Sequence, residues 1–238
     1  MPEDAQDSHN AHDPHDLQEQ WTAVDTYLSE SLSLSDPALE AALAANAAGG
    51  LPSIDVSPSQ GKFLQLLAQL RGARRILEIG TLGGYSTICM ARALPEGGRV
   101  VTLEVNAKHA EVARANIARA GLAEVVEIRV GPALETLARM QEEGAEPFDM
   151  IFIDADKPNN PAYLGWALKF SRRGSLILCD NVVRDGAVAD AESTDPGVRG
   201  ARGLFEMLGA EPRLSATALQ TVGLKGYDGF AMALVVGD

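Results

Sequence analysis

Two apolar segments that resemble buried strands end in oxygen-bearing side chains. The segment "FDMIFID" ends at Asp154, and "SLILCD" ends at Asp180, directly before Asn181. The carboxyl ends of successive strands are neighbours in a doubly wound sheet, so these three side chains would lie together. Carboxylate and amide oxygens suit a hard cation, and three protein ligands leave positions for water and substrate. We predict a divalent-cation site, for Mg²⁺ first, with Ca²⁺ or Mn²⁺ as alternatives. Taken singly, these residues could instead cap a helix or form a turn.

A lysine follows Asp154 by three residues. A divalent cation close to a lysine favours its neutral form, and a neutral lysine can act as a general base. We therefore predict that Lys157, with Asp154 beside it, forms the catalytic part of the site. The alternative is an ordinary surface lysine in a loop.

A glycine-rich turn lies in "RRILEIGTLGGYST", after another apolar segment. Gly80, Gly83 and Gly84 have the spacing G-x-x-G-G, which differs from the G-x-G-x-x-G fingerprint that places a pyrophosphate on a helix N-terminus. Glu78 precedes the first glycine by two residues, and its carboxylate would repel a pyrophosphate. It suits a cationic ligand such as S-adenosylmethionine, which carries a sulfonium and an ammonium group. The alternative is a tight strand-to-helix turn with no ligand.

A second acidic residue, Glu104, lies at the end of the next apolar segment, "RVVTLEV", where only Val105 follows it. A carboxylate at that place can accept both hydroxyl groups of a ribose. This holds for NAD as well as for S-adenosylmethionine, so Glu104 alone does not separate the two. A final antiparallel hairpin is typical of the methyltransferase version of the sheet, and the end of this chain has that pattern.

The strands and helices that must position these residues alternate along the chain. The predicted strands are residues 74–80, 99–105, 125–131, 148–154 and 175–180, separated by predicted helices at 85–94, 107–120, 133–141 and 161–170. Such alternation predicts an α/β fold with a parallel sheet covered on both faces. Residues 216–222 and 229–236 predict the closing hairpin. Three helices come first, two of them with the caps Asp36 and Ser57, and Ser57 with Gln60 forms a capping-box pattern.

The composition limits the classes of partner and the location. The chain has 238 residues and a formal net charge of −13, which argues against nucleic acid and anionic membranes. It has no apolar run long enough to span a membrane and no signal-peptide pattern, so we expect a cytoplasmic protein. Cys89 and Cys179 are expected to be reduced core thiols.

The predicted domain organisation is a tail followed by one domain. Residues 1–16 form a polar tail that we expect to be disordered, and residues 17–238 form a single domain with N-terminal helices at 17–72 and a Rossmann-like core at 73–238. The tail contains His9, His12 and His15, which could bind a transition metal weakly; we favour a solvated tail.

The motifs "LEIGTLGGYST", "VTLEVN", "GPALETL", "DADK" and "DNVVRDG" together resemble the cation-dependent O-methyltransferases, the family of catechol and caffeoyl-CoA O-methyltransferases. The resemblance is strongest to the small bacterial members and extends from about Val24 to Val236. It implies the seven-stranded Rossmann-like methyltransferase sheet with an antiparallel last strand, S-adenosylmethionine as donor, magnesium or a similar cation, and a homodimer.

The resemblance also assigns roles to single residues of this chain. Within the donor site it implies Glu78, Gly80, Thr81 and Ser86 at the methionine end and the turn, Glu104 at the ribose, Ala133 at the adenine pocket, and Asp156, Tyr163, Asp154 and the backbone of Val56 close by. It gives the metal to Asp154, Asp180 and Asn181, and the role of base to Lys157.

The predicted function is methyl transfer from S-adenosylmethionine to an aromatic diol, with help from a divalent cation. No Lys or Arg precedes Lys62 in the N-terminal helices, which flank the acceptor in this family, so we expect a small catechol-type or polyphenol acceptor and not a coenzyme A ester. Residues 184–202 predict either a mobile lid or a plain linker. The alternatives are an NAD-dependent oxidoreductase and a non-catalytic S-adenosylmethionine-binding module on the same fold.

Overall fold

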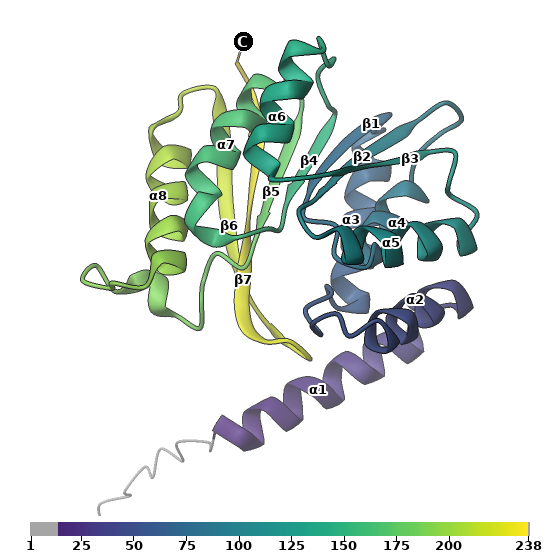
Figure 1. Ribbon diagram of the computed structural model, residues 1–238. Coiled ribbons are helices and arrows are strands. Elements are labelled where there is room, and N and C mark those ends of the chain that lie inside the picture. The colour runs from purple at the N-terminus through teal and green to yellow at the C-terminus, as the bar shows by residue number, and fades with distance from the viewer. Residues whose placement is uncertain (1–13, 238) are drawn as a thin grey trace, which may run out of the picture.

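The computed structural model describes residues 14–237, which are organised around one seven-stranded sheet (Figure 1). The strand order is β3-β2-β1-β4-β5-β7-β6. The strands are β1 (Arg75–Ile79), β2 (Arg99–Glu104), β3 (Val126–Val130), β4 (Met150–Ile153), β5 (Leu176–Asp180), β6 (Leu214–Gly223) and β7 (Gly226–Val235). Strands β1 to β5 pair in parallel, whereas β7 is antiparallel to β5 and β6. The predicted fold class is therefore confirmed.

Eight α-helices are present among the described residues, and six of them cover the two faces of the sheet. They are α1 (Pro14–Ser31), α2 (Pro37–Ala48), α3 (Pro58–Arg71), α4 (Tyr85–Ala91), α5 (Ala107–Arg119), α6 (Ala133–Glu142), α7 (Asn160–Lys169) and α8 (Pro196–Ala210). Helices α6, α7 and α8 lie on one side and α3, α4 and α5 on the other, while α2 packs on α4 and α5, and α1 runs past the tip of the β6–β7 hairpin (Figure 1). No helix within residues 14–237 is long and apolar enough to cross a membrane.

The buried residues form two apolar clusters, one on each face of the sheet. Because strand side chains alternate between faces, Leu77 and Ile79 join the cluster under α6 to α8, and Ile76 joins the cluster under α2 to α5. Cys89 and Cys179 are buried free thiols, one in each cluster. Covering both faces explains why the central strands read as continuous apolar runs in the sequence.

Local sequence determines where the helices begin. The Asp36 side chain accepts from the amides of Ala38 and Leu39, and Ser57 accepts from the amide of Gln60, each cap being followed by proline at the first helical position. Helix α1 begins at Pro14, three residues before the predicted start. Of the three tail histidines, His15 therefore lies in α1, and His9 and His12 lie outside the described residues.

The strand order reverses between β1 and β4, where the connections leave in opposite directions. Ligands of open α/β sheets bind in the crevice beyond the carboxyl ends of the strands at such a point. Gly80 follows β1 and Asp154 follows β4, so the glycine turn and the first predicted metal ligand face the same crevice.

Candidate active site

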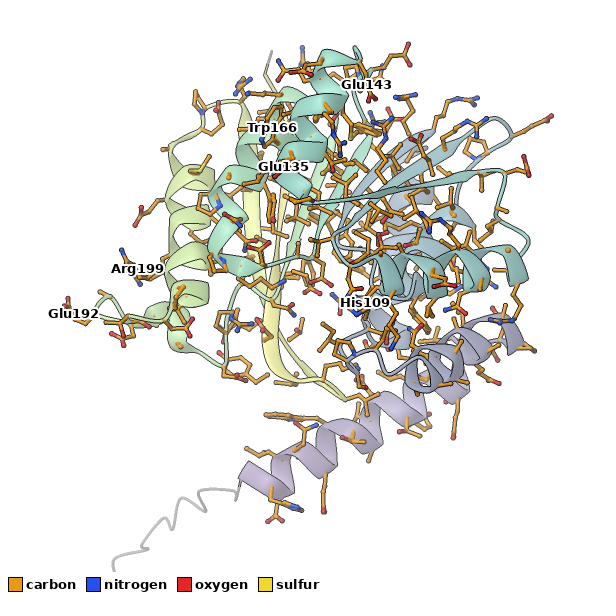
Figure 2. The ribbon with its side chains drawn as sticks, viewed as in Figure 1. His109, Glu135, Glu143, Trp166, Glu192 and Arg199 are labelled. Atoms are coloured by element: carbon orange, nitrogen blue, oxygen red, sulfur yellow. The ribbon has the colours of Figure 1, made fainter. Side chains whose placement is uncertain are left out.

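A cavity of about 900 Å³ opens at the reversal of strand order. Its volume lies within the range of small-molecule sites. Figure 2 labels two of its lining residues, His109 on α5 and Glu135 on α6. All predicted site residues except Glu78 and Asp180 line it: Val56, Gly80, Thr81, Ser86, Glu104, Ala133, Asp154, Asp156, Lys157, Tyr163 and Asn181. The fold thus brings together side chains from positions 56 to 181 of the chain.

The glycine turn allows the ends of β1 and β4 to approach closely. Gly80 has φ +103°, and a Cβ atom there would lie 2.0 Å from the carbonyl oxygen of Asp154. Gly83 is restricted as well, because its Cβ atom would meet the Asn46 side chain at 1.9 Å. A side chain at either position would clash, so these glycines are required by the packing of the turn itself.

Glu78 lies beneath the cavity instead of lining it, and its side chain is completely buried. Its carboxylate accepts hydrogen bonds from Ser86 Oγ at 2.5 Å, from Thr102 Oγ1 at 2.6 Å and from Thr87 Oγ1. Burial raises the pKa of Glu78 to about 7, although these three hydroxyl groups oppose the rise. Its direct contact with a cationic ligand stays a prediction. What the hydrogen bonds provide is a fixed orientation for Ser86, which does line the cavity.

Glu104, at the end of β2, is held in place by backbone amides. Oε2 accepts from the amide of Leu82 at 2.8 Å, and Oε1 accepts from the amide of Asn106 at 2.9 Å. His109 Nδ1 lies 3.6 Å from Oε1. A carboxylate offers about four lone-pair sites, so both oxygens keep capacity for further donors such as ribose hydroxyl groups.

The cluster predicted to bind a cation lies at the ends of β4 and β5. Lys157 Nζ donates to Asp154 Oδ1 at 2.8 Å. Asp180 is 6% exposed, and its pKa is raised by burial and then by the charge of Asp154, while Lys157 opposes the rise. Asn181 has φ +53°, a left-handed backbone conformation that few residues adopt. The buried Asp180 is therefore within electrostatic reach of both Asp154 and Lys157.

The electrostatics of this cluster fit a cation. The buried Asp180 carboxylate, whose pKa is raised by burial and then by the charge of Asp154, forms with Asp154 and the Asn181 amide an oxygen donor set that suits a cation. Within residues 14–237 no three His, Cys, Asp or Glu side chains are grouped so as to hold a metal. The predicted set contains only two such residues, because its third member is Asn181.

Asp156 and Tyr163 form a further polar pair in the cavity wall. Tyr163 Oη donates to Asp156 Oδ1, and Asn159 Nδ2 donates to Asp156 Oδ2 at 2.5 Å. Burial and the bond to Asp156 raise the pKa of Tyr163, so this phenol stays protonated. The pair fixes the loop that leads from β4 into α7.

One group of buried polar residues was missed by the sequence analysis. Asp55 lines the cavity and accepts from Asn46 Nδ2 at 2.8 Å. Asn46 Oδ1 in turn accepts from Asn116 Nδ2 at 3.0 Å, and Asn116 also donates to the carbonyl oxygen of Gly83 at 2.9 Å. This network connects α2, α5, the glycine turn and the segment before α3. The only local signal was one Asn within the apolar pattern of α2 and one within that of α5, and a helical hydrophobic pattern gives no role to a single polar residue.

Arg184 is a second lining residue that the sequence analysis did not single out. It has φ +58°, and the carboxylate of Asp228 holds its loop by accepting from the amides of Val183 and Arg184 at 2.9 and 3.0 Å. The segment that follows packs on α8, where Arg202 Nη1 donates to the carbonyl oxygen of Val188 at 2.7 Å. Its role as a mobile lid stays a prediction.

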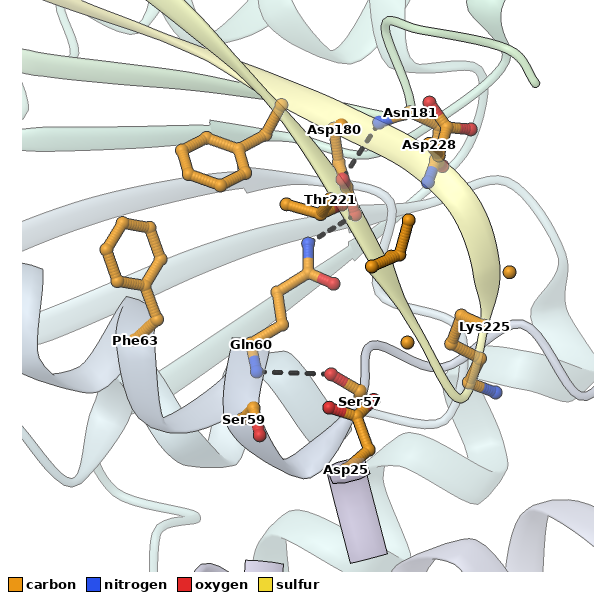
Figure 3. Close-up of a pocket in the computed structure, with 15 residues that line it drawn as sticks. Asp25, Ser57, Ser59, Gln60, Phe63, Asp180, Asn181, Thr221, Lys225 and Asp228 are labelled. Carbon is orange, nitrogen blue, oxygen red and sulfur yellow. Dashed lines mark hydrogen bonds between the residues drawn. The ribbon is translucent and has the colours of Figure 1, made fainter. Parts of the chain in front are cut away.

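A smaller cavity of about 280 Å³ adjoins the large one, and Asn181 lines both. Its walls come from α3, the end of β5 and the β6–β7 hairpin, and they include Asp180 and the Phe63–Phe230 ring pair, whose centroids are 5.1 Å apart (Figure 3). Asn181 thus lies between the two cavities, and Asp180 faces the smaller one.

The sheet ends in an antiparallel strand and opens a cavity at its strand reversal. The cavity has an acid at the end of β2, and its glycine turn lacks the pyrophosphate fingerprint. Together these features define the class of S-adenosylmethionine-dependent methyltransferases. Residues 30–234 match the family described as O-methyltransferase. The chain belongs to that family, and the enzyme is an S-adenosylmethionine-dependent O-methyltransferase. The oxidoreductase and the non-catalytic module are thereby set aside.

Individual relatives support the same assignment. The chain is 59% identical over 215 residues to a catechol O-methyltransferase of Niastella koreensis, covering 90% of this chain and 97% of the relative. It is 57% identical over 212 residues to a catechol O-methyltransferase of Mycobacterium tuberculosis, covering 89% and 94%. A crystal structure of the O-methyltransferase from Bacillus cereus in complex with SAH matches with TM-score 0.91 and 63% identity, covering 92% of this chain and 99% of that one.

Proposed function

We propose that this enzyme methylates one hydroxyl group of a small vicinal-dihydroxy aromatic compound and that a divalent cation assists the reaction. The observation that carries the proposal is the cluster of Asp154, Lys157 and Asn181 in the wall of the donor cavity, with Asp180 next to it in the wall of the adjoining smaller cavity. The names of the two relatives, both catechol O-methyltransferases, support the class of acceptor.

The residues that would hold the cation are Asp154, Asp180 and Asn181. When bound, the cation would hold the two adjacent acceptor oxygens and favour the ionised phenol, whose pKa in water is near 10. Lys157 lies against Asp154 in this structure. Lys157 would be the general base that takes the proton of the acceptor hydroxyl, since a cation held by Asp154 would weaken the support of that carboxylate for the lysine ammonium.

The side chains proposed to contact the methyl donor are themselves fixed by hydrogen bonds. Ser86 is fixed by Glu78, and Glu104 is fixed by two backbone amides. In the proposed transfer the acceptor oxygen takes the methyl group of S-adenosylmethionine, which loses its positive charge. A pocket that excludes water and aligns the two reactants favours such a step.

The decisive experiment compares the wild-type enzyme with Asp154→Ala and Asp180→Ala in a methylation assay on catechol. Wild-type activity should disappear in chelator and return with Mg²⁺. Both variants should lose metal-dependent turnover and retain their circular dichroism spectrum. Full activity of either variant in chelator would remove the cation from the proposed mechanism.

We also infer a homodimer. Tyr27 on α1, Leu32 directly after α1 and Leu219 on β6 are each more than half exposed, and they support an association surface on that side of the molecule. Light scattering after gel filtration tests this, and a monomer at micromolar concentration would contradict it. The cytoplasmic location stays a prediction.

A further inference from the structure

The first turn of α3 contacts the end of β5 through one side chain. The sequence predicts a capping box, in which the Gln60 side chain would return to the backbone of Ser57. Only half of that motif forms, since Ser57 Oγ accepts from the Gln60 amide at 3.2 Å. Gln60 Nε2 donates instead to Asp180 Oδ2 at 2.7 Å, across 120 positions of sequence (Figure 3).

This bond completes the orientation of the Asp180 carboxylate. Oδ1 accepts from the amide of Asn181 at 2.8 Å, and Oδ2 accepts from Gln60. The first donor belongs to the loop that Asp180 itself begins, and the second belongs to a different element. Each oxygen accepts one donor and keeps a lone pair for another partner. With both oxygens engaged, rotation of the carboxylate about its own axis is restricted.

Helix α3 is a rigid support for that donor. Gly61, the next residue, packs so closely on α4 that a Cβ atom would lie 2.9 Å from Cys89 Sγ and 3.0 Å from the Tyr85 ring. One turn later, the Phe63 ring packs against Phe230 of β7. The start of α3 is therefore fixed against both α4 and the sheet, and the backbone of Gln60 is fixed with it.

We propose that Gln60 is a positioning residue for the cation site, holding Asp180 so that its free lone pairs face the region between Asp154 and Asn181. The inference rests on the proposed function, since it assumes that a cation binds there. Outer hydrogen-bond partners of this kind orient metal-binding carboxylates. A neutral amide suits the position, because a lysine or arginine would compete with the cation and a glutamate would add a third carboxylate to a buried site.

The test measures cation binding directly, without turnover. Mn²⁺ is titrated into the full-length protein in the absence of donor and acceptor, and free Mn²⁺ is followed by electron paramagnetic resonance. Gln60→Leu keeps the approximate size of the side chain and removes the donor. It should weaken Mn²⁺ binding by about 10- to 100-fold, which is the usual effect of losing an outer hydrogen-bond partner. Gln69→Leu, an exposed position on the same helix, is the matched control and should bind as the wild type does.

Two further measurements separate positioning from general stability. Gln60→Asn keeps an amide but shortens the side chain, so it should weaken Mn²⁺ binding as well even if Gln60→Leu folds poorly. The affinity for S-adenosylmethionine should stay within about twofold of wild type in both variants, since Gln60 does not line the donor cavity. Wild-type Mn²⁺ affinity in both Gln60 variants overturns the inference alone. Failure of the wild-type protein to bind Mn²⁺ overturns the proposed cation site and this inference with it.

Discussion

Lys157 Nζ lies 2.8 Å from Asp154 Oδ1, and both side chains line the donor cavity. The pair stands at the carboxyl end of β4, where one residue is the proposed cation ligand and the other the proposed base. Their hydrogen bond keeps the lysine ammonium at the rim of the sheet, beside the proposed cation ligand. Lys157 is only 12% exposed, so its position is determined by the protein and not by solvent.

Replacing this lysine should remove the base without removing the donor site. Lys157→Met keeps most of the side-chain volume, and it should lower kcat by about 10²- to 10⁴-fold, the typical contribution of general base catalysis. The affinity for S-adenosylmethionine, measured by calorimetry, should change little. Lys62→Met is the control, because Lys62 contacts Gln65 on the outer part of α3. Unchanged kcat in Lys157→Met would assign the proton transfer to another group.

The close approach of β1 and β4 should make Gly80 intolerant of a side chain. Gly80→Ala combines a left-handed backbone with a Cβ atom 2.0 Å from the carbonyl oxygen of Asp154. We expect a loss of at least ~3 kcal/mol in the free energy of unfolding. Gly165→Ala on α7 is the control, since nothing lies within 4 Å of its Cβ position. That variant should gain up to ~1 kcal/mol from helix propensity. Equal stability of the two variants in urea denaturation would contradict the clash.

The buried Glu78 predicts a pH-dependent stability for the ligand-free enzyme. Burial raises the pKa of Glu78 to about 7, above the ordinary value of 4.5 that applies in the unfolded chain. The folded state therefore holds the proton more tightly. The stability from this group is fully present below about pH 4.5 and is lost as the pH rises through about 7. Across that interval the loss amounts to about 3 kcal/mol, at 1.36 kcal/mol for each pKa unit.

Glu78→Gln should remove this part of the pH dependence, because an amide does not titrate. The measurement is urea denaturation of the wild type and the variant at pH 5 and at pH 8. Between pH 5 and pH 8 the wild type should lose ~2–3 kcal/mol more of its free energy of unfolding than the variant does. A difference that stays constant between pH 5 and 8 would show that Glu78 has an ordinary pKa in the folded state.

Glu104→Gln should weaken donor binding. The substitution removes the negative charge that makes hydrogen bonds from ribose hydroxyl groups strong, and bonds to a charged group contribute roughly 1.5–3 kcal/mol. The dissociation constant for S-adenosylmethionine should rise by about 10- to 100-fold, as calorimetry would show. Glu135→Gln, on another part of the same cavity wall, is a matched control for loss of charge. If both variants bind alike, Glu104 has no special contact with the donor.

The acceptor should be the free acid and not the coenzyme A ester. The N-terminal helices carry no Lys or Arg before Lys62, so they offer no partner for the phosphates of coenzyme A. In competition assays with caffeic acid and caffeoyl-CoA, we expect a higher kcat/KM for caffeic acid. A clear preference for caffeoyl-CoA would refute this.

The elements of the fold could be predicted because each depends on residues close in sequence. Apolar runs identified all seven strands, and proline, Asp36 and Ser57 identified helix starts to within a few residues. The carboxyl ends of the strands then follow from topology, which is why Asp154 and Asn181 meet in one cavity as expected. Motifs read in order along the chain also led to the correct family.

Side-chain partners distant in sequence could not be predicted in this way. The sequence pointed to Glu78 but not to the three hydroxyl groups that donate to its carboxylate beneath the cavity. Gln60 was expected to complete a local cap, yet it donates to Asp180.

The sequence by itself determined the order of strands and helices, the glycine turn and the carboxylates at the strand ends, since backbone propensity and apolar periodicity act over a few residues. The tertiary structure alone decided which polar groups are buried together and which remain in the cavity. Those pairings depend on how whole helices pack on the sheet, and a shift of one side chain's rotamer is enough to exchange a local partner for one on another strand.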